Sequence, residues 1–162
     1  MKFLVFSFLF CTTFLLQQDL TKIRAEYPKA SQSEALAKEL YESLLPVTLE
    51  GNKVLVAYKG AATTIMALFG NGIKEKTTLF NEGKDLLEYA VKEDPSNIEI
   101  RCIRMSVQEH APKITGYHEN IGEDKKFILI NYKHTRSQEV KNFVKSYALQ
   151  SEAFNESEKQ TF

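Results

Sequence analysis

Apolar positions recur three and four residues apart along most of this chain, which is the spacing of amphipathic helices. Prolines and glycines interrupt the pattern, notably at Pro28, Pro46, Gly70, Pro95 and Pro112. The pattern therefore predicts an all-α fold. The expected helices cover residues 19–27, 31–45, 53–69, 73–93, 98–110, 123–134 and 137–150.

Three of these segments carry additional signals. Ser31 and Glu34 form the pattern of a capping box, which places the start of the second helix at Ser31. The segment 53–69 is apolar nearly all round, so we expect it in the centre of the fold. The four apolar residues 127–130 fit a short strand as well as a helix, and their helical surroundings favour the helix.

The first residues form a separate apolar segment. Met1 and Lys2 precede an almost unbroken apolar run over residues 3–16, and the first acidic residue is Asp19. A positive start followed by roughly 7–15 apolar residues is typical of a secretory signal, whereas a membrane span needs about 20. We therefore expect residues 1–18 to be a signal peptide. The mature protein is then exported to a bacterial periplasm, a cell surface or the medium.

Other fates of this segment stay open. No small-x-small cleavage site follows the apolar run. Cys11 allows a lipid-modified cysteine, although the residues before it match a lipobox poorly, and an uncleaved N-terminal anchor is a further alternative. A buried helix of a cytosolic protein fits less well, because residues 3–16 are apolar on every side rather than on one.

Charge and cysteine content exclude some classes of partner. The chain has 21 basic and 21 acidic side chains, and loss of Lys2 with the leader leaves 20 basic against 21 acidic, a net charge of −1. This balance provides no long-range attraction to nucleic acid or to anionic membrane. We therefore expect no nucleic-acid partner and no membrane contact beyond the signal segment. Only Cys102 lies outside the leader, so an exported form has no internal disulfide.

The turn between the fourth and fifth expected helices carries a family resemblance. Gly83, Leu87, Ala90 and Pro95 stand where tetratricopeptide repeats place a small, a large apolar, a small and a helix-ending residue. The stretch 83–99 thus resembles part of one tetratricopeptide (TPR) repeat, but the residues that follow do not fit a next repeat. The resemblance implies stacked antiparallel helical hairpins, about seven helices in all.

A polar stripe on the fifth expected helix offers a candidate binding surface. Arg101, Arg104 and Gln108 share one side of this helix, and Lys59 and Thr63 form a comparable stripe on the third. Placed side by side, the stripes form a basic concave surface for a carboxylate or an acidic peptide, since arginine presents a bidentate fork to carboxylates. The alternative is a solvated face with local ion pairs to nearby glutamates.

A second candidate site is an apolar pocket on the third helix. Tyr58, Met66 and Phe69 are the residues that mark it. Ligand pockets in proteins are mostly apolar with a few polar groups, so these residues suit a small apolar molecule.

Known catalytic and metal-binding patterns are missing from the sequence. The glutamate–histidine spacing of di-iron bundles, the zincin helix and the nucleophile elbow are all absent. Cys102 falls on an apolar side of its helix, where a thiol behaves as an inert hydrophobe. His110 and His118 flank a loop and are expected to lie at the surface or to brace that loop. We therefore expect no catalysis, no metal and no cofactor.

These observations predict one helical domain over residues 19–150, after the signal peptide over 1–18 and before a polar tail over 151–162 that frays or forms a short last turn. The expected function is that of an exported, non-catalytic binding or scaffolding module for a protein or peptide partner. The alternative is a periplasmic carrier of a small apolar molecule.

Overall fold

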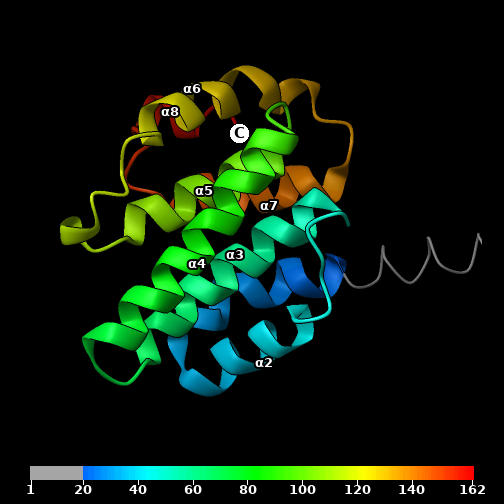
Figure 1. The fold of residues 1–162 in the computed structure, drawn as a ribbon. Helices are drawn as coiled ribbons and strands as arrows, with labels where there is room; N and C mark the ends of the chain where they lie inside the picture. The colour runs from blue at the N-terminus through cyan, green and yellow to red at the C-terminus, as the bar shows by residue number, and fades with distance from the viewer. Residues whose placement is uncertain (1–19) are drawn as a thin grey trace, which may run out of the picture.

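The structure, a computed structural model, describes residues 20–162 as an assembly of helices (Figure 1). Residues 20–26 are helical and continue into the 3-10 helix η1 (Tyr27–Gln32). The part of the chain that is described contains no strand, which confirms the all-α prediction. The remaining elements are α2 (Glu34–Leu44), α3 (Lys53–Phe69), α4 (Gly72–Glu93), α5 (Ile98–His110), η2 (Lys113–Thr115), α6 (Ile121–Asn131), η3 (Tyr132–His134), α7 (Gln138–Gln150) and α8 (Glu156–Lys159).

Side-chain caps fix several of the helix starts. Asn52 accepts a hydrogen bond from the Val54 amide at 2.9 Å. Helix α3 begins at Lys53, directly after Asn52, as the sequence predicts. The predicted start of α2 at Ser31 is wrong. Residues 27–32 form η1, and Ser33 instead caps α2 by accepting from the Leu36 amide at 3.3 Å. The ambiguous run 127–130 is helical, within α6.

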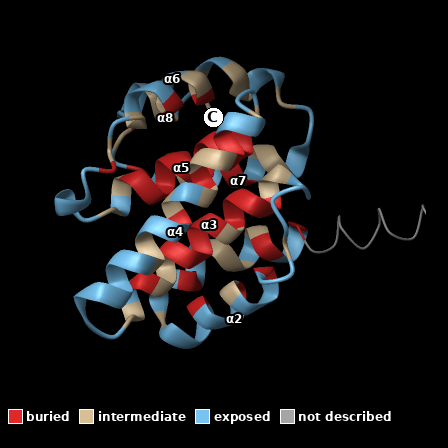
Figure 2. Cartoon of the chain, in the orientation of Figure 1, coloured by how far each residue is buried: buried red, intermediate tan, exposed pale blue. Residues whose placement is uncertain are grey.

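Helix α3 lies at the centre of the fold, as its composition predicts (Figure 2). It forms a hairpin with α4, and the two backbones touch where they cross. A Cβ atom added to Gly83 would lie 2.5 Å from the Gly60 carbonyl oxygen, closer than real Cβ contacts allow. Glycine at both positions is therefore what permits this crossing.

Helix α5 is covered by other helices along most of its length. Every residue from Ile98 to Gln108 is buried, because α3 and α4 pack on one side while α6 and α7 pack on others. The two apolar faces that the sequence places on this helix are both covered, and the Cys102 thiol lies within the core. Burial raises the pKa of that thiol, which keeps it protonated.

The chain after α7 folds back onto α6 rather than fraying. Phe154 is buried, and Lys125 on α6 donates a hydrogen bond to the Ala153 carbonyl at 3.0 Å. The same lysine pairs with Glu158 on α8 at 2.8 Å. The last residues thus form a docked turn of helix with Asn155 and Glu158 as a capping box.

The predicted signal peptide lies outside the described residues. Within residues 20–162, no helix combines the length and the apolar character that crossing a membrane requires.

Candidate functional site

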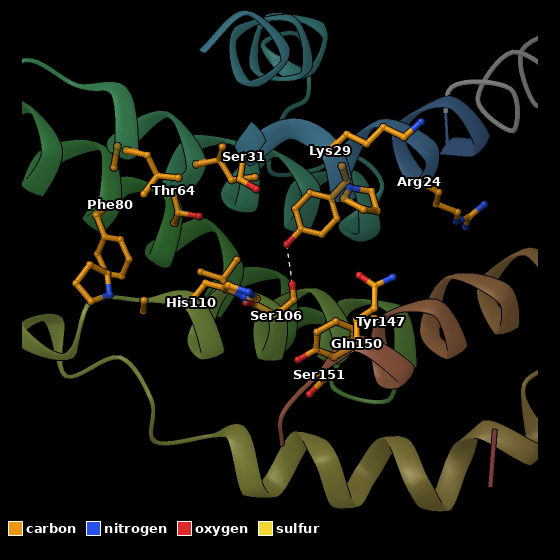
Figure 3. Close-up of a pocket in the computed structure, with 18 of the residues that line it drawn as sticks. Arg24, Lys29, Ser31, Thr64, Phe80, Ser106, His110, Tyr147, Gln150 and Ser151 are labelled. Carbon is orange, nitrogen blue, oxygen red and sulfur yellow. Dashed lines mark hydrogen bonds between the residues drawn. The ribbon is translucent and has the colours of Figure 1, made fainter. Parts of the chain in front are cut away.

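A groove with a volume of about 1290 Å³ opens beside the central hairpin (Figure 3). One wall comes from the segment 21–31, and another from the second half of α3 and the first turns of α4. Helix α7 forms the opposite wall, while the end of α5 and the η2 loop close the remainder. Figure 3 shows Phe80 on the α4 side and Tyr147 with Gln150 on the α7 side, with Ser106 and His110 between them.

Apolar and aromatic side chains form most of the groove's inner surface. Ile65, Phe80, Val107 and Phe143 line it from α3, α4, α5 and α7. Phe143 packs against the Tyr27 ring, with 6.3 Å between the ring centroids. These contacts join segments that are far apart in the sequence into one apolar floor.

The hydroxyl of Tyr27 is engaged at the floor of the groove. It lies 2.6 Å from the Ser106 hydroxyl, which itself donates to the Ile103 carbonyl at 2.7 Å. Because a serine hydroxyl has one proton, Tyr27 is the donor in this pair. Burial raises the pKa of Tyr27, so the phenol stays neutral.

A carboxylate anchors the polar groups below α7. Glu109 accepts hydrogen bonds from the Tyr147 hydroxyl, from the Ser151 hydroxyl at 2.8 Å and from the Ala153 amide at 3.0 Å. The phenol of Tyr147 is mostly buried, and burial raises its pKa. The hydroxyls of Tyr147 and Ser151 therefore serve the protein's own structure.

Arg24 occupies one end of the groove in a network of charges. Its Nε and Nη2 atoms donate to the buried Glu99 carboxylate at 2.7 and 2.8 Å, and its Nη1 atom donates to Glu139 at 3.3 Å. The Tyr58 hydroxyl also donates to Glu99, at 2.8 Å. These hydrogen bonds tie the N-terminal helix to α3 and α5, and the bond with Glu99 raises the pKa of Arg24.

The buried polar groups around the groove are engaged within the protein. In the described part of the chain, every buried side-chain nitrogen and oxygen atom has a hydrogen-bond partner. His110 uses its Nδ1 atom on the Ser106 carbonyl at 2.8 Å, and His118 uses Nε2 on the Ala111 carbonyl at 3.0 Å. Both histidines therefore brace the end of α5 and its loop, as predicted. Residues 20–162 contain no group of three or more His, Cys, Asp or Glu side chains placed to hold a metal ion.

Comparisons with known proteins add no family to this geometry. No protein-family model matches the chain, and neither does a curated protein or a solved structure. The tetratricopeptide resemblance therefore stays a prediction.

The basic surface predicted on α5 does not exist as an exposed face. Arg101, Arg104 and Gln108 are all buried, because α6 packs over them. Asp124 on α6 accepts from Arg101 at 2.8 Å and from Arg104 at 2.7 Å, and it is itself fully buried. Gln108 donates to Asn120 at 3.1 Å. The prediction that these three side chains line an open surface is therefore wrong, and their partners are internal.

The stripe predicted on α3 is also occupied by local contacts. Lys59 donates to the carbonyls of Leu45 and Val47, at 3.0 and 2.6 Å, and so holds the end of α2. Thr63 is buried and donates to the Lys59 carbonyl at 2.7 Å. Lys59 contacts the α2–α3 connection and Thr63 bonds within α3, whereas Arg101 and Arg104 contact α6, so the two stripes form no common surface.

None of the three residues predicted to mark an apolar pocket on α3 lines the groove. Tyr58 is fully buried behind the floor, where its ring stacks edge-on against Phe143 at 5.9 Å. Met66 and Phe69 are half-buried and lie outside the lining. The α3 residues that do line the groove are Thr64, Ile65, Ala67 and Leu68.

Sequence reasoning missed the residues that α4, α5 and α7 contribute to the groove. On α7 they recur with helical spacing at Glu139, Asn142, Phe143, Ser146 and Tyr147. This stripe mixes polar and apolar residues, so it differs little from an ordinary surface face. No signal in the sequence indicates that it faces Phe80 across an open space.

Proposed function

We propose that this protein is an exported, non-catalytic binding module whose groove holds a ligand with a long apolar chain, such as a fatty acid or another acyl lipid. The observation that carries the proposal is the groove itself, an apolar hollow of about 1290 Å³ whose inner polar groups are already paired. Ligand pockets usually measure about 300–1000 Å³, so this hollow has room for an extended chain.

The pairing of the polar groups favours an apolar ligand. Tyr27, Ser106 and Tyr147 contribute hydroxyls to the groove lining, and each is committed to a partner within the protein. A ligand rich in hydrogen-bonding groups would leave those groups unpaired in the groove, which costs free energy. A hydrocarbon chain meets no such penalty and gains from the removal of apolar surface from water.

The burial of the α5 arginines favours a small ligand over an acidic peptide. The peptide hypothesis rested on Arg101, Arg104 and Gln108 as an open surface, and these side chains are enclosed by α6. The carrier hypothesis needs an apolar hollow, and the groove supplies one, although its lining does not include the predicted Tyr58, Met66 and Phe69. The carrier is therefore the better supported of the two functions.

Export and the lack of catalysis are parts of the same proposal. Export rests on the apolar run 3–16 after Lys2, which is typical of a secretory signal. The non-catalytic role is supported by the engagement of His110, Tyr147 and Glu109 in structural hydrogen bonds. An apolar chain is poorly soluble in water, so a carrier outside the cytoplasm shields such a ligand from water.

Two adjacent threonines on α4 provide a matched test. Thr77 lines the groove, whereas Thr78 does not. Both residues are exposed and lie on the same helix. We expect Thr77→Trp to fill the hollow and weaken binding of a dansyl-labelled undecanoic acid by about tenfold or more. Thr78→Trp should bind the probe like the parent chain, because its indole points away from the groove.

Fluorescence titration of the purified proteins measures both affinities, and circular dichroism confirms that both variants fold. Equal weakening by the two substitutions, or no saturable binding by the parent chain, would contradict the proposal. Native mass spectrometry of the parent protein adds an independent readout, since a co-purifying lipid is then observed as added mass.

A further inference from the structure

Three aliphatic side chains stand exposed around the mouth of the groove. Leu68, Ile73 and Ile114 all line it, and their side chains are 52%, 85% and 96% exposed. Single exposed aliphatic residues are common on protein surfaces. These three differ from scattered residues because they line one opening, and exposed apolar groups gathered at one place are a feature of interaction sites.

Two tight turns present Ile73 and Ile114, while Leu68 lies in the last turn of α3. Gly72 has a φ of 77° and starts α4 directly before Ile73, and Gly116 has a φ of 66° and ends the η2 turn that carries Ile114. Positive φ values favour glycine, so the glycine at each of these positions allows the turn to form. The α3–α4 turn and the η2 loop lie at the same side of the molecule (Figure 1).

Lysines accompany the aliphatic residues on both turns. Residues 68–77 and 110–116 contain Lys74, Lys76 and Lys113, against the single carboxylate of Glu75. Glu75 is engaged by the Asn71 amide at 2.5 Å. Within residues 20–162, neither Lys74 nor Lys113 forms an ion pair. The two turns at the mouth therefore carry a local excess of positive charge although the chain as a whole is neutral, so a membrane contact there departs from the expectation drawn from the net charge.

We infer that the mouth of the groove docks onto the surface of an anionic lipid bilayer. Ile73 and Ile114 enter the interfacial region, and the three lysines lie among the negative headgroups. The inference rests on the proposed function, because docking there turns the groove toward the membrane and gives an acyl chain a route between bilayer and protein.

The arrangement fits a bilayer better than a protein partner. Ile73 and Ile114 project from separate turns instead of forming one flat patch, and the turns carry lysine but no tyrosine, tryptophan or arginine. Protein interfaces are enriched in those three residue types and depleted in lysine. A lysine beside an anionic headgroup keeps its hydration, so the charge complementarity needs no exact fit.

Co-sedimentation with phospholipid vesicles tests this inference. The probes are vesicles of phosphatidylcholine alone and vesicles with about one third phosphatidylglycerol, which supplies the negative surface. We expect binding to the anionic vesicles only, decreasing as salt is added. The double variant Ile73→Ser with Ile114→Ser should lower the bound fraction about fivefold or more, since it removes the inserting side chains.

The control variant is Ile130→Ser, which replaces an exposed isoleucine of α6 outside the groove. It should bind vesicles like the parent chain. Failure of the parent to bind anionic vesicles, or undiminished binding by the double variant, would overturn the inference. The dansyl-fatty-acid titration in solution separates the two proposals. If the fatty acid binds and the vesicles do not, only the docking surface fails; if the isoleucine-dependent vesicle binding remains without fatty-acid binding, only the carrier function fails.

Discussion

At the scale of single residues, buried charged side chains of this protein pair with side chains of opposite charge. Asp124 is fully buried and receives hydrogen bonds from Arg101 at 2.8 Å and from two nitrogens of Arg104 at 2.7 Å. Arg104 also donates to Glu88 at 3.0 Å, which links α4 to the same cluster. This cluster fastens α6 over α5.

Removal of the central carboxylate should be costly. Asp124→Asn leaves two guanidinium groups without their shared charge partner in the interior, so we expect a loss of about 3 kcal/mol or more in the free energy of unfolding. Glu123→Gln is the control, because Glu123 pairs with Arg101 while its side chain is 60% exposed, and its loss should cost about 1 kcal/mol or less. Urea denaturation of the two variants measures the difference, and similar midpoints would contradict a structural role for Asp124.

Buried tyrosines predict a loss of stability in alkali. Burial raises the pKa values of Tyr27, Tyr58, Tyr117 and Tyr147 above their ordinary value. An unfolded tyrosine ionises near pH 10, so above that pH the unfolded chain holds fewer protons than the folded one and stability falls as pH rises. Below that pH the contribution is fully present. We expect tyrosinate absorbance of these groups to appear together with the loss of helical circular dichroism; ionisation in a chain that remains helical would contradict their burial.

The residues that sequence reasoning placed correctly are those whose role is local. Cys102 falls on an apolar stripe and is buried, and the two loop histidines brace their own loop. Arg101 and Arg104 were misplaced because a helical wheel shows a polar side but does not show what covers it. The carboxylate that covers the two arginines is that of Asp124 on α6, about twenty residues later in the chain. The sequence of α6 carries no pattern that predicts where this helix packs.

At the scale of elements, most helix bounds follow from capping residues and breakers. Asn52 and Asn97 cap α3 and α5, and these helices begin where the sequence predicts. The start of α2 was misplaced because Ser31 and Glu34 match a capping box, whereas the 3-10 helix η1 extends through Gln32. Prolines are compatible with the first turn of a helix, so Pro28 does not end the helical stretch.

The crossing of α3 and α4 depends on two glycines. Gly83→Ala would place a methyl group 2.5 Å from the Gly60 oxygen and 2.6 Å from Thr64 Cγ2, and we expect a loss of about 1–3 kcal/mol in stability. Gly122→Ala is the control, because nothing lies within 4 Å of the added methyl group on α6. It should leave stability unchanged or raise it by up to about 1 kcal/mol. Thermal denaturation compares the two, and an unchanged midpoint for Gly83→Ala would show that the hairpin tolerates wider spacing.

At the scale of the whole molecule, the groove arises only from the assembled fold. Its walls come from residues 21–31, 64–81, 106–115 and 139–151, which meet through packing of several helices on α3 and α5. Helical periodicity predicts the helices that form the walls. It does not predict which helix faces remain separated by the groove. The sequence therefore predicts the all-α fold, whereas the position of the groove is found only in the structure.

Photo-crosslinking tests the central claim, that this groove holds an acyl chain. A fatty acid with a diazirine in its chain is bound to the purified protein and activated, and the labelled peptides are mapped by mass spectrometry. The account predicts labels within residues 21–31, 64–81, 106–115 and 139–151, which excess unlabelled fatty acid removes. Labels confined to α2, α6 or α8, or labels that excess fatty acid does not displace, would contradict it.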